Sequence, residues 1–229
     1  MAAQIVNKPN SQYTESTLNN MSAMSSIPNI LTFLHRANQL KTIIRYKSSL
    51  SKNGDTVADH SLRLALMVFV IGGELQIPVN ISHAMKLALL HDLAELETDD
   101  VDAVDVIKKK VKLEDKQKNE AAAMKHIVKD ISFGGEIFAL WNEYEKQQTL
   151  EAKFVKALDK IEAFLHLDET GTSVYIPKEF YADYADAAVN SFDIASKHFP
   201  PLKGILDPIK TELKRKFEEN GVMWVEKTA

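Results

Sequence analysis

The chain contains no cysteine among its 229 residues. Disulfide bonds, thiolate nucleophiles and cysteine-ligated zinc sites are therefore excluded, so any bound metal must be held by histidine and carboxylate side chains. A chain without cysteine also suits the cytoplasm, where disulfides are rare, and we expect a cytoplasmic protein.

Long apolar runs and an excess of positive charge are missing too. No window approaches the roughly 18 apolar residues that a membrane-spanning helix needs, so we expect no membrane partner. The 28 basic and 32 acidic residues give a formal net charge of −4. A nucleic-acid-binding surface needs clustered Lys and Arg, and the basic run Lys108-Lys109-Lys110 is short, so nucleic acid is not an expected partner.

Glycine and proline are scarce, at 8 and 7 residues, and the apolar residues recur at helical spacing without an alternating strand pattern. We therefore predict an all-α, single-domain helical bundle. Residues 1–27 are rich in polar residues without periodicity and are predicted to be a flexible tail. The domain is predicted over 28–229, with its core at about 34–167 and extra helices after it.

Two helix starts carry clear signals. Thr56 to Asp59 resembles a capping box at the start of one helix. In the last predicted helix, Asp207 can cap and Pro208 fits the first helical position. Other helices are predicted at about 28–40, from Ser82 through Glu95, and at about 119–131, 135–147, 149–167 and 177–198.

The stretch ALLHDLAELETDD, residues 88–100, begins as an apolar helix and then becomes ionisable. Helical neighbours lie three, four and seven positions apart, so His91 and Glu95 continue the apolar stripe on which Ala88 lies. Asp92 follows Ala88 by four positions and precedes Glu95 by three. Half of this stripe suits a core, whereas the other half carries an imidazole and carboxylates.

Two other predicted helices share this feature. His60 lies within an apolar seam, and Asp159 flanks the apolar face of a later helix. Burying an unpaired imidazole or carboxylate is costly, and few buried cations are expected, because Lys and Arg mostly fall on outward faces. One divalent cation (Mn, Co, Mg, Fe, Ni or Zn) between two imidazoles and two carboxylates would offset the cost. Hydrogen-bonded core side chains without a metal are the alternative, and spacing alone leaves both open.

The order His60, His91-Asp92, Asp159 resembles the signature of the HD-domain metal-dependent phosphohydrolases. Three stretches are similar to the 5'-deoxynucleotidase-like branch of that family: TVADHSLRLALM, ALLHDLAELETDD and LWNEYEKQQTLEAKFVKALDKIE. The resemblance spans about residues 34–167. It implies an all-helical HD fold, one bound divalent metal ion, a homodimer, and hydrolysis of nucleoside monophosphates.

The resemblance also implies roles for single residues. Four match the family's metal ligands: His60, His91, Asp92 and Asp159. Glu95 matches an acidic residue that positions or deprotonates the attacking water. Asp100 matches an active-site aspartate, which protonates the leaving oxygen or holds the substrate.

Arg45 and Tyr46 are the predicted substrate-binding residues. Arg45 precedes His60 by fifteen positions, the spacing of an arginine that meets the substrate phosphate in the family. Tyr46 stands where the family often has Trp near the sugar, which leaves the preference for deoxyribose over ribose open. Asp99 replaces a family glycine, adds a negative charge and restricts the backbone.

We therefore predict a metal-dependent 5'-nucleotidase that hydrolyses (deoxy)nucleoside 5'-monophosphates. The alternatives are hydrolysis of another nucleotide phosphoester, namely a triphosphate, cyclic or alarmone nucleotide, and a non-catalytic HD domain that binds a nucleotide or a partner. A helical scaffold whose histidines and aspartates are satisfied by hydrogen bonds alone is a further alternative.

Overall fold

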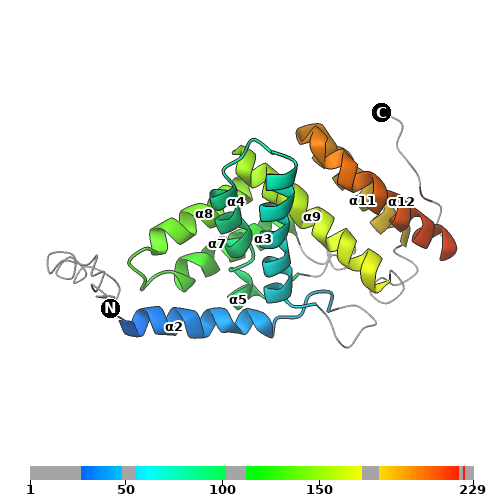
Figure 1. The fold of residues 1–229 in the computed structure, drawn as a ribbon. Coiled ribbons are helices and arrows are strands. Elements are labelled where there is room, and N and C mark those ends of the chain that lie inside the picture. The colour runs from blue at the N-terminus through cyan, green and yellow to red at the C-terminus, as the bar shows by residue number, and fades with distance from the viewer. Residues whose placement is uncertain (1–26, 48–54, 102–111, 172–180, 222–223, 225–229) are drawn as a thin grey trace, which may run out of the picture.

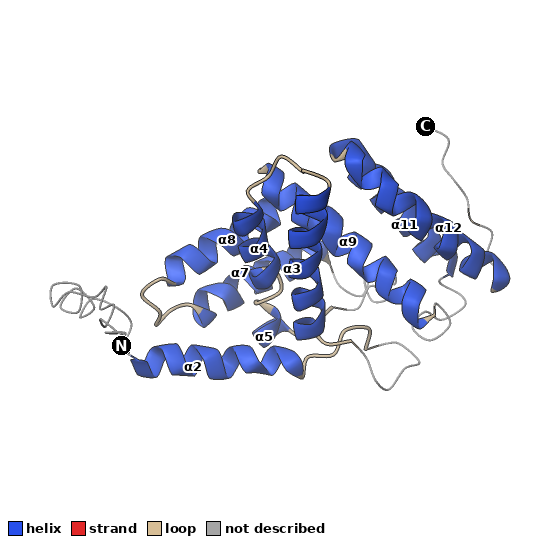
Figure 2. Ribbon diagram, viewed as in Figure 1, coloured by secondary structure: helices blue, strands red, loops and turns tan. Residues whose placement is uncertain are grey.

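The computed structural model describes residues 27–47, 55–101, 112–171, 181–221 and 224. Regular structure in these ranges is helical, apart from one isolated bridge between Ile44 and Thr56. The predicted all-helical fold is confirmed (Figure 2). The predicted tail lies outside the described residues up to Ser26, and the first described helix begins at Ile27. No described helix has the length and apolarity that crossing a membrane requires.

The described helices pack around a central group of three, α3, α4 and α9, as Figure 1 shows. Helices α7 and α8 lie to one side of this group, and α11 and α12 lie to the other. In chain order the elements are α2 (Ile27–Ala37), η2 (Asn38–Lys41), α3 (Val57–Glu74), α4 (Ile81–Leu90), α5 (Glu95–Thr98), α7 (Leu113–Ile127), α8 (Gly134–Lys146), α9 (Leu150–Thr170), α11 (Tyr181–His198), η4 (Pro200–Leu202) and α12 (Lys203–Glu219).

Two clusters of buried apolar side chains hold the helices together. The larger joins α3, α4, α8, α9, α11 and α12 and includes Leu64, Leu158 and Phe192. The smaller lies around α7 and α8 and includes Met124 and Trp141. Helix α9 therefore runs through the interior, so a polar side chain on its buried face is enclosed by the fold.

The helix caps fix how α3 and α4 enter the core. Thr56 Oγ1 accepts from Asp59 N at 3.1 Å, and the Asp59 carboxylate accepts from Thr56 N at 3.2 Å. This is the predicted capping box. Asn80 caps α4 by accepting from His83 N at 3.1 Å. The first turn of α3, which carries His60, is thereby held in place.

The prediction of one continuous helix from Ser82 through Glu95 is wrong. Helix α4 ends at Leu90, residues 91–94 form a turn, and the short helix α5 starts at Glu95. His91 and Asp92 therefore lie in the turn and not in α4, the helix that carries their buried apolar neighbours. Both side chains are still directed inward.

Two other predicted starts are also wrong. Helix α7 begins at Leu113 rather than near residue 119, and acidic residues in its first turn suit the positive end of the helix dipole. Helix α12 begins at Lys203, so Asp207 does not cap it and Pro208 lies inside it. The preceding turn η4 leads directly into α12, and an internal proline removes one backbone hydrogen bond without ending the helix here.

Candidate metal centre

Four ionisable side chains from three segments meet inside the fold. His60 comes from α3, His91 and Asp92 from the turn after α4, and Asp159 from the middle of α9. His60 Nε2 lies 3.2 Å from His91 Nε2, 3.7 Å from Asp92 Oδ2 and 3.2 Å from Asp159 Oδ1. His91 Nε2 lies 2.9 Å from Asp92 Oδ2. These four residues are called the four-residue cluster below.

The four-residue cluster is closed on its histidine side. His60 and His91 are 1% and 3% exposed, whereas the Asp92 side chain keeps 23% of its surface exposed and that of Asp159 keeps 12%. The two carboxylates line a cavity and the imidazoles lie beneath them. A ligand therefore reaches the cluster from the carboxylate side.

The second nitrogen of each imidazole is already bound. His91 Nδ1 donates to the Ala88 carbonyl at 2.8 Å. His60 Nδ1 makes a short hydrogen bond with the carboxylate of Glu162, which is 1% exposed. Both bonds direct Nε2 toward the cluster, which is how metal-ligating histidines are commonly oriented.

Glu162 is held in turn by Arg45. Arg45 Nη1 lies 3.3 Å from Glu162 Oε2 and 2.9 Å from Asp55 Oδ2. The Arg45 amide also donates to the Asp55 carbonyl at 2.8 Å, which joins the two segments on either side of residues 48–54. The predicted phosphate-binding arginine therefore also supports the carboxylate that orients His60.

Asp159 is fixed from its other side. Its Oδ2 accepts from Tyr144 Oη at 2.8 Å and from Lys156 Nζ at 3.0 Å. Burial opposes ionisation of Asp159, but Lys156 and the hydrogen bond to His60 hold its pKa well below the usual range. No Lys or Arg among the described residues is fully buried, but the half-buried Lys156 and Arg45 both reach inward and pair with acids.

The charges of the cluster fit a divalent cation. Burial and Arg45 disfavour protonation of His60, yet the hydrogen bonds that it donates to the carboxylates of Asp159 and Glu162 raise its pKa to about 9. Burial also resists ionisation of Asp92, but the neighbouring histidines hold its pKa below the usual range. The cluster thus attracts positive charge, and donor atoms of His60, His91 and Asp92 lie within 4.8 Å of one another. Imidazole and carboxylate together suit several divalent metals.

Glu95 opens α5, three residues after Asp92, and lines the cavity. It is 4% exposed, and its Oε2 has no hydrogen-bond partner in the part of the chain that the structure describes. Burial and the charges of Asp92 and Asp100 raise its pKa to about 10. A buried carboxyl oxygen of this kind calls for a water or ligand partner.

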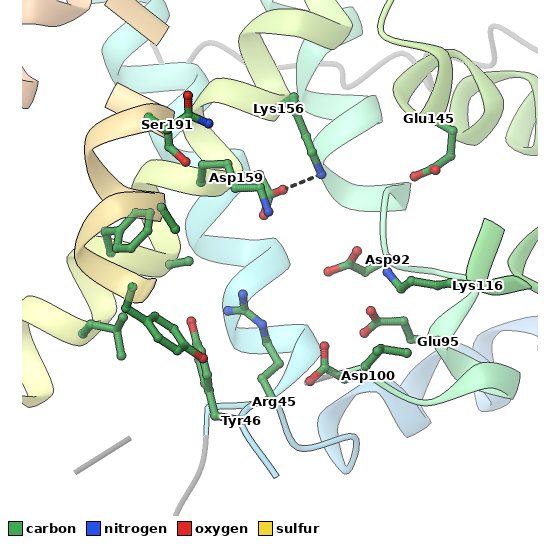
Figure 3. A pocket seen from close by; sticks show the side chains of 18 of the residues that line it. Arg45, Tyr46, Asp92, Glu95, Asp100, Lys116, Glu145, Lys156, Asp159 and Ser191 are labelled. Atoms are coloured by element: carbon green, nitrogen blue, oxygen red, sulfur yellow. Dashed lines mark hydrogen bonds and ion pairs between the residues drawn. The ribbon is translucent and has the colours of Figure 1, made fainter. Parts of the chain in front are cut away.

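A cavity of about 600 Å³ adjoins the cluster, a volume within the ~300–1,000 Å³ typical of small-molecule sites. Figure 3 shows Arg45, Asp92, Glu95 and Asp100 around one space, with Asp159 across from them. Tyr46 lines it as well. Since His60 and His91 lie beneath it, all eight residues singled out in the sequence come together.

Sequence reasoning missed three charged residues at this site: Lys156, Lys160 and Glu162. Lys156 and Glu162 lie three positions before and after Asp159, so their helical spacing was a usable signal. Lys160 also lines the cavity and is exposed. It forms no ion pair with any described residue, whereas the other lining cations are each paired with a carboxylate: Arg45, Lys116 and Lys156.

Two residues beside the cavity have left-handed backbone conformations. Tyr46 has φ 58°, and its ring stacks on His166 with centroids 5.7 Å apart. Asp99 has φ 61° and ψ 163°, a conformation that is costly for residues other than glycine. Asp99 Oδ1 lies 3.1 Å from Lys47 Nζ. Asp99, at which the sequence predicted a restricted backbone, thus adopts a conformation that glycine tolerates better than aspartate.

Comparison with known proteins agrees with this geometry. The HD domain family model matches residues 37–195. The human 5'-deoxynucleotidase HDDC2 is 34% identical over 170 residues, which cover 72% of this chain and 78% of the human protein. The zebrafish (Danio rerio) 5'-deoxynucleotidase HDDC2 is 37% identical over 147 residues, 62% of this chain and 69% of that protein.

Solved structures share the fold. A crystal structure described as a predicted metal-dependent phosphohydrolase from Magnetospirillum magnetotacticum superposes with a TM-score of 0.68 at 24% identity, covering 88% of this chain and all of that one. At that identity the likeness bears on the fold alone. The family match spans more than half of the chain and confirms the family predicted from the sequence. This protein belongs to the HD-domain family.

Proposed function

We propose that this protein is a metal-dependent phosphomonoesterase that hydrolyses (deoxy)nucleoside 5'-monophosphates to nucleoside and phosphate. The observation that carries the proposal is the convergence of His60, His91, Asp92 and Asp159 at the wall of a ligand-sized cavity. The names of the human and zebrafish relatives, both 5'-deoxynucleotidases, agree with the reaction class predicted from the sequence.

The four-residue cluster would hold one divalent cation through the two Nε2 atoms and the two carboxylates. When bound, a divalent cation lowers the pKa of water and of nearby carboxyl groups and withdraws charge from phosphoryl oxygens. Glu162 and Ala88 keep the two imidazoles oriented, and Lys156 keeps Asp159 charged. These partners fix the donor atoms before any ligand arrives.

Glu95 and Asp100 would handle the protons of the reaction. Glu95 Oε2 has no described partner and faces the cavity from one turn beyond Asp92, so it can take the proton of the attacking water. As the new bond from water oxygen to phosphorus forms, the bond to the ester oxygen breaks. Asp100, whose charge raises the Glu95 pKa, would protonate that leaving oxygen or hold the substrate.

The phosphate of the substrate would lie between Arg45 and Lys160. Arg45 pairs with both Glu162 and Asp55 through Nη1. Because Arg45 also lines the cavity, another N–H of its guanidinium group can donate to the phosphate. Lys160 forms no ion pair with a described carboxylate, and Asp159, the neighbouring residue in the cluster, is the acidic group that acts on it most strongly. Tyr46, packed between Arg45 and His166, would contact the sugar.

We also propose a homodimer and a cytoplasmic location. An exposed apolar stripe on α3, with Leu62, Leu66 and Phe69 at 54–60% exposure, supports the homodimer. Light scattering tests it, and a monomer at working concentrations would refute it. The cysteine-free composition supports the location, which cell fractionation tests.

The reaction is tested by phosphate release from a substrate panel. Metal-stripped protein resupplied with Mn, Co, Mg or Zn is given deoxy- and ribonucleoside 5'-monophosphates, 3'-monophosphates, a triphosphate and a cyclic nucleotide. We expect release from the 5'-monophosphates. Release from the triphosphate or cyclic nucleotide alone would establish the alternative phosphoester activity, and no release from any of them, with cation bound, would favour a binding domain.

A further inference from the structure

The cavity at the four-residue cluster extends into a groove between α9 and α11. The residues that line the groove recur at helical spacing on both helices, so one face of each is turned toward the other. We call it the α9–α11 groove, lined by Lys160, Ala163, Phe164, Leu167, Asp183, Tyr184, Ala187, Asn190 and Ser191.

The two helices run in opposite directions along the groove. Ser191, in the second half of α11, is drawn near Asp159 in Figure 3, and both residues line the cavity. Tyr184, near the start of α11, lies close enough to Tyr46 to perturb its ionisation. The groove therefore begins at the cluster and continues away from it, past the middle of both helices.

The middle of the groove is apolar. Phe164, Leu167 and Tyr184 are buried beneath it, at 6%, 1% and 6% exposure. Ala163 and Ala187 flank it and project only a methyl group. Side chains this short leave room between the helices, and the buried rings offer the apolar surface on which a planar group packs.

The end of the groove nearest the cluster is polar but uncharged on its α11 side. Asn190 contributes a carboxamide and Ser191 a hydroxyl, so both donors and acceptors face the cavity. Lys160 faces the same end from α9. A molecule lying along the cavity would thus meet charge, then hydrogen-bonding groups, then apolar surface.

We propose that the α9–α11 groove binds the nucleobase of the nucleoside monophosphate whose phosphate lies at the four-residue cluster. This assignment rests on the proposed function and adds the part of the site that holds the rest of the substrate. A nucleotide has the matching sequence of groups: a dianion, a hydroxylated sugar and a flat aromatic base. Few polar groups and an apolar slot are the usual composition of such sites.

The groove should recognise the presence of a base more than its identity. The apolar residues at the middle of the groove would contact the face of a base, and such a contact does not depend on the donors and acceptors at the base edge. The Asn190 carboxamide lies nearer the cluster, where it would face the sugar. The four common deoxynucleoside monophosphates are expected to differ in kcat/KM by about tenfold or less.

Filling the groove with Ala187→Leu tests the assignment. Ala187 is exposed, so a larger side chain can be tolerated, and Ala182→Leu is the matched control at an exposed alanine of α11 outside the cavity. Binding of the nucleosides deoxyadenosine and thymidine, which carry no phosphate, is measured by calorimetry on the metal-loaded protein. We expect Ala187→Leu to weaken binding about tenfold relative to wild type and Ala182→Leu. Equal binding by all three proteins would overturn the assignment.

Measuring hydrolysis of two substrates tests the groove assignment separately from the proposed function. Deoxyadenosine monophosphate is compared with deoxyribose 5-phosphate, which has the phosphate and sugar but no base. The ratio of their kcat/KM values should fall about tenfold in Ala187→Leu and stay within twofold in Ala182→Leu. An unchanged ratio in Ala187→Leu would overturn the groove assignment while hydrolysis persists. If wild type hydrolyses neither compound, the proposed function fails and nucleoside binding still decides whether the groove holds a base.

Discussion

The two walls of the cavity differ in how their side chains are held. On the wall formed by α3, α9 and the turn after α4, charged groups are tied to one another, His60 to Glu162 and Asp159 to Lys156. On the α11 wall, Ala187 and Asn190 are exposed, and the residues of this helix that line the cavity form no such charged network with other described residues. The first wall fixes atoms in place, whereas the second mainly sets the shape of the space.

This difference predicts different responses to mutation. A buried, paired group cannot lose its partner without leaving a charge uncompensated, so changes on the first wall should affect the rate or cation binding strongly. Changes on the second wall should alter which substrate is accepted. The following substitutions test that division, beginning with the largest effect.

Glu95→Gln should give the largest loss of activity among single substitutions. Removing a group that takes a proton from the attacking water typically lowers the rate by about 10²–10⁴-fold. Glutamine keeps the size of the side chain, so cation binding should remain close to wild type. We would measure kcat and cation affinity together, and a variant within threefold of wild-type kcat would remove Glu95 from the proton transfer.

The same substitution should stabilise the metal-stripped protein. Burial and the charges of Asp92 and Asp100 raise the Glu95 pKa from its ordinary 4.5 to about 10, so between these values the folded state holds a proton that the unfolded state releases. The free energy of unfolding of the wild-type protein therefore falls as pH rises above about 4.5. Glu95→Gln should raise Tm at pH 8 by about 3 °C, the shift expected for ~1 kcal/mol in a chain of this size, and change it little at pH 4.5. Equal Tm shifts at the two pH values would contradict the buried, protonated carboxyl.

Glu162→Gln should weaken cation binding by about 10–100-fold, the usual effect of removing the partner that orients a metal-ligating histidine. Glu162 is buried and contacts both His60 and Arg45. Glu169→Gln is the matched control, because Glu169 lies on the same helix but is exposed and pairs with Arg63. Titration with Mn²⁺ measures the affinity, and equal affinity in both variants would show that the His60–Glu162 bond is dispensable.

Lys160→Ala should lower kcat/KM about tenfold, which corresponds to about 1.4 kcal/mol of lost phosphate binding. Most of the loss should appear in KM, since the side chain acts on the substrate dianion rather than on the proton transfer. Lys197→Ala, an exposed lysine on α11 outside the cavity, is the control. Steady-state kinetics at fixed ionic strength measure the effect, and identical KM values in the two variants would exclude a phosphate contact by Lys160.

Asp99→Gly should have the smallest effect and the opposite sign. Glycine adopts φ 61°, ψ 163° without the strain that aspartate has there, and the exposed Asp99–Lys47 pair contributes little. We expect the free energy of unfolding in urea to rise by about 1 kcal/mol. Asp99→Asn removes the charge but keeps a side chain, so a gain shared by both variants would assign the effect to charge rather than to backbone strain.

Much of the wall formed by α3, α9 and the turn after α4, which carries the four-residue cluster, was predictable from the sequence. Helical spacing placed His60 and Asp159 on or beside buried faces, and the family resemblance joined them to His91 and Asp92. The break after Leu90 was not predictable from spacing, because the turn at residues 91–94 keeps the same residues directed inward. Periodicity indicates which side chains are buried but does not distinguish a helix from a well-placed turn.

The partners of the cluster and the α11 wall were less accessible to sequence reasoning. Arg45 reaches Glu162 across more than a hundred residues, so no local pattern relates them. The α9–α11 groove depends on how two helices pack, and its alanines are ordinary helix residues in the sequence. A regular helix was predictable, but the space between two helices required the packed structure.

The central claim is that one divalent cation, held by the four-residue cluster, is required for phosphomonoester hydrolysis. The most direct measurement is phosphate release from a deoxynucleoside 5'-monophosphate while metal-stripped protein is titrated with Mn²⁺ or Co²⁺, beside a His91→Ala, Asp92→Ala double variant. We predict that release rises from background to a plateau near one equivalent of cation, and that the double variant stays at least about a thousandfold lower. Release that persists without cation, or in the double variant, would contradict this account.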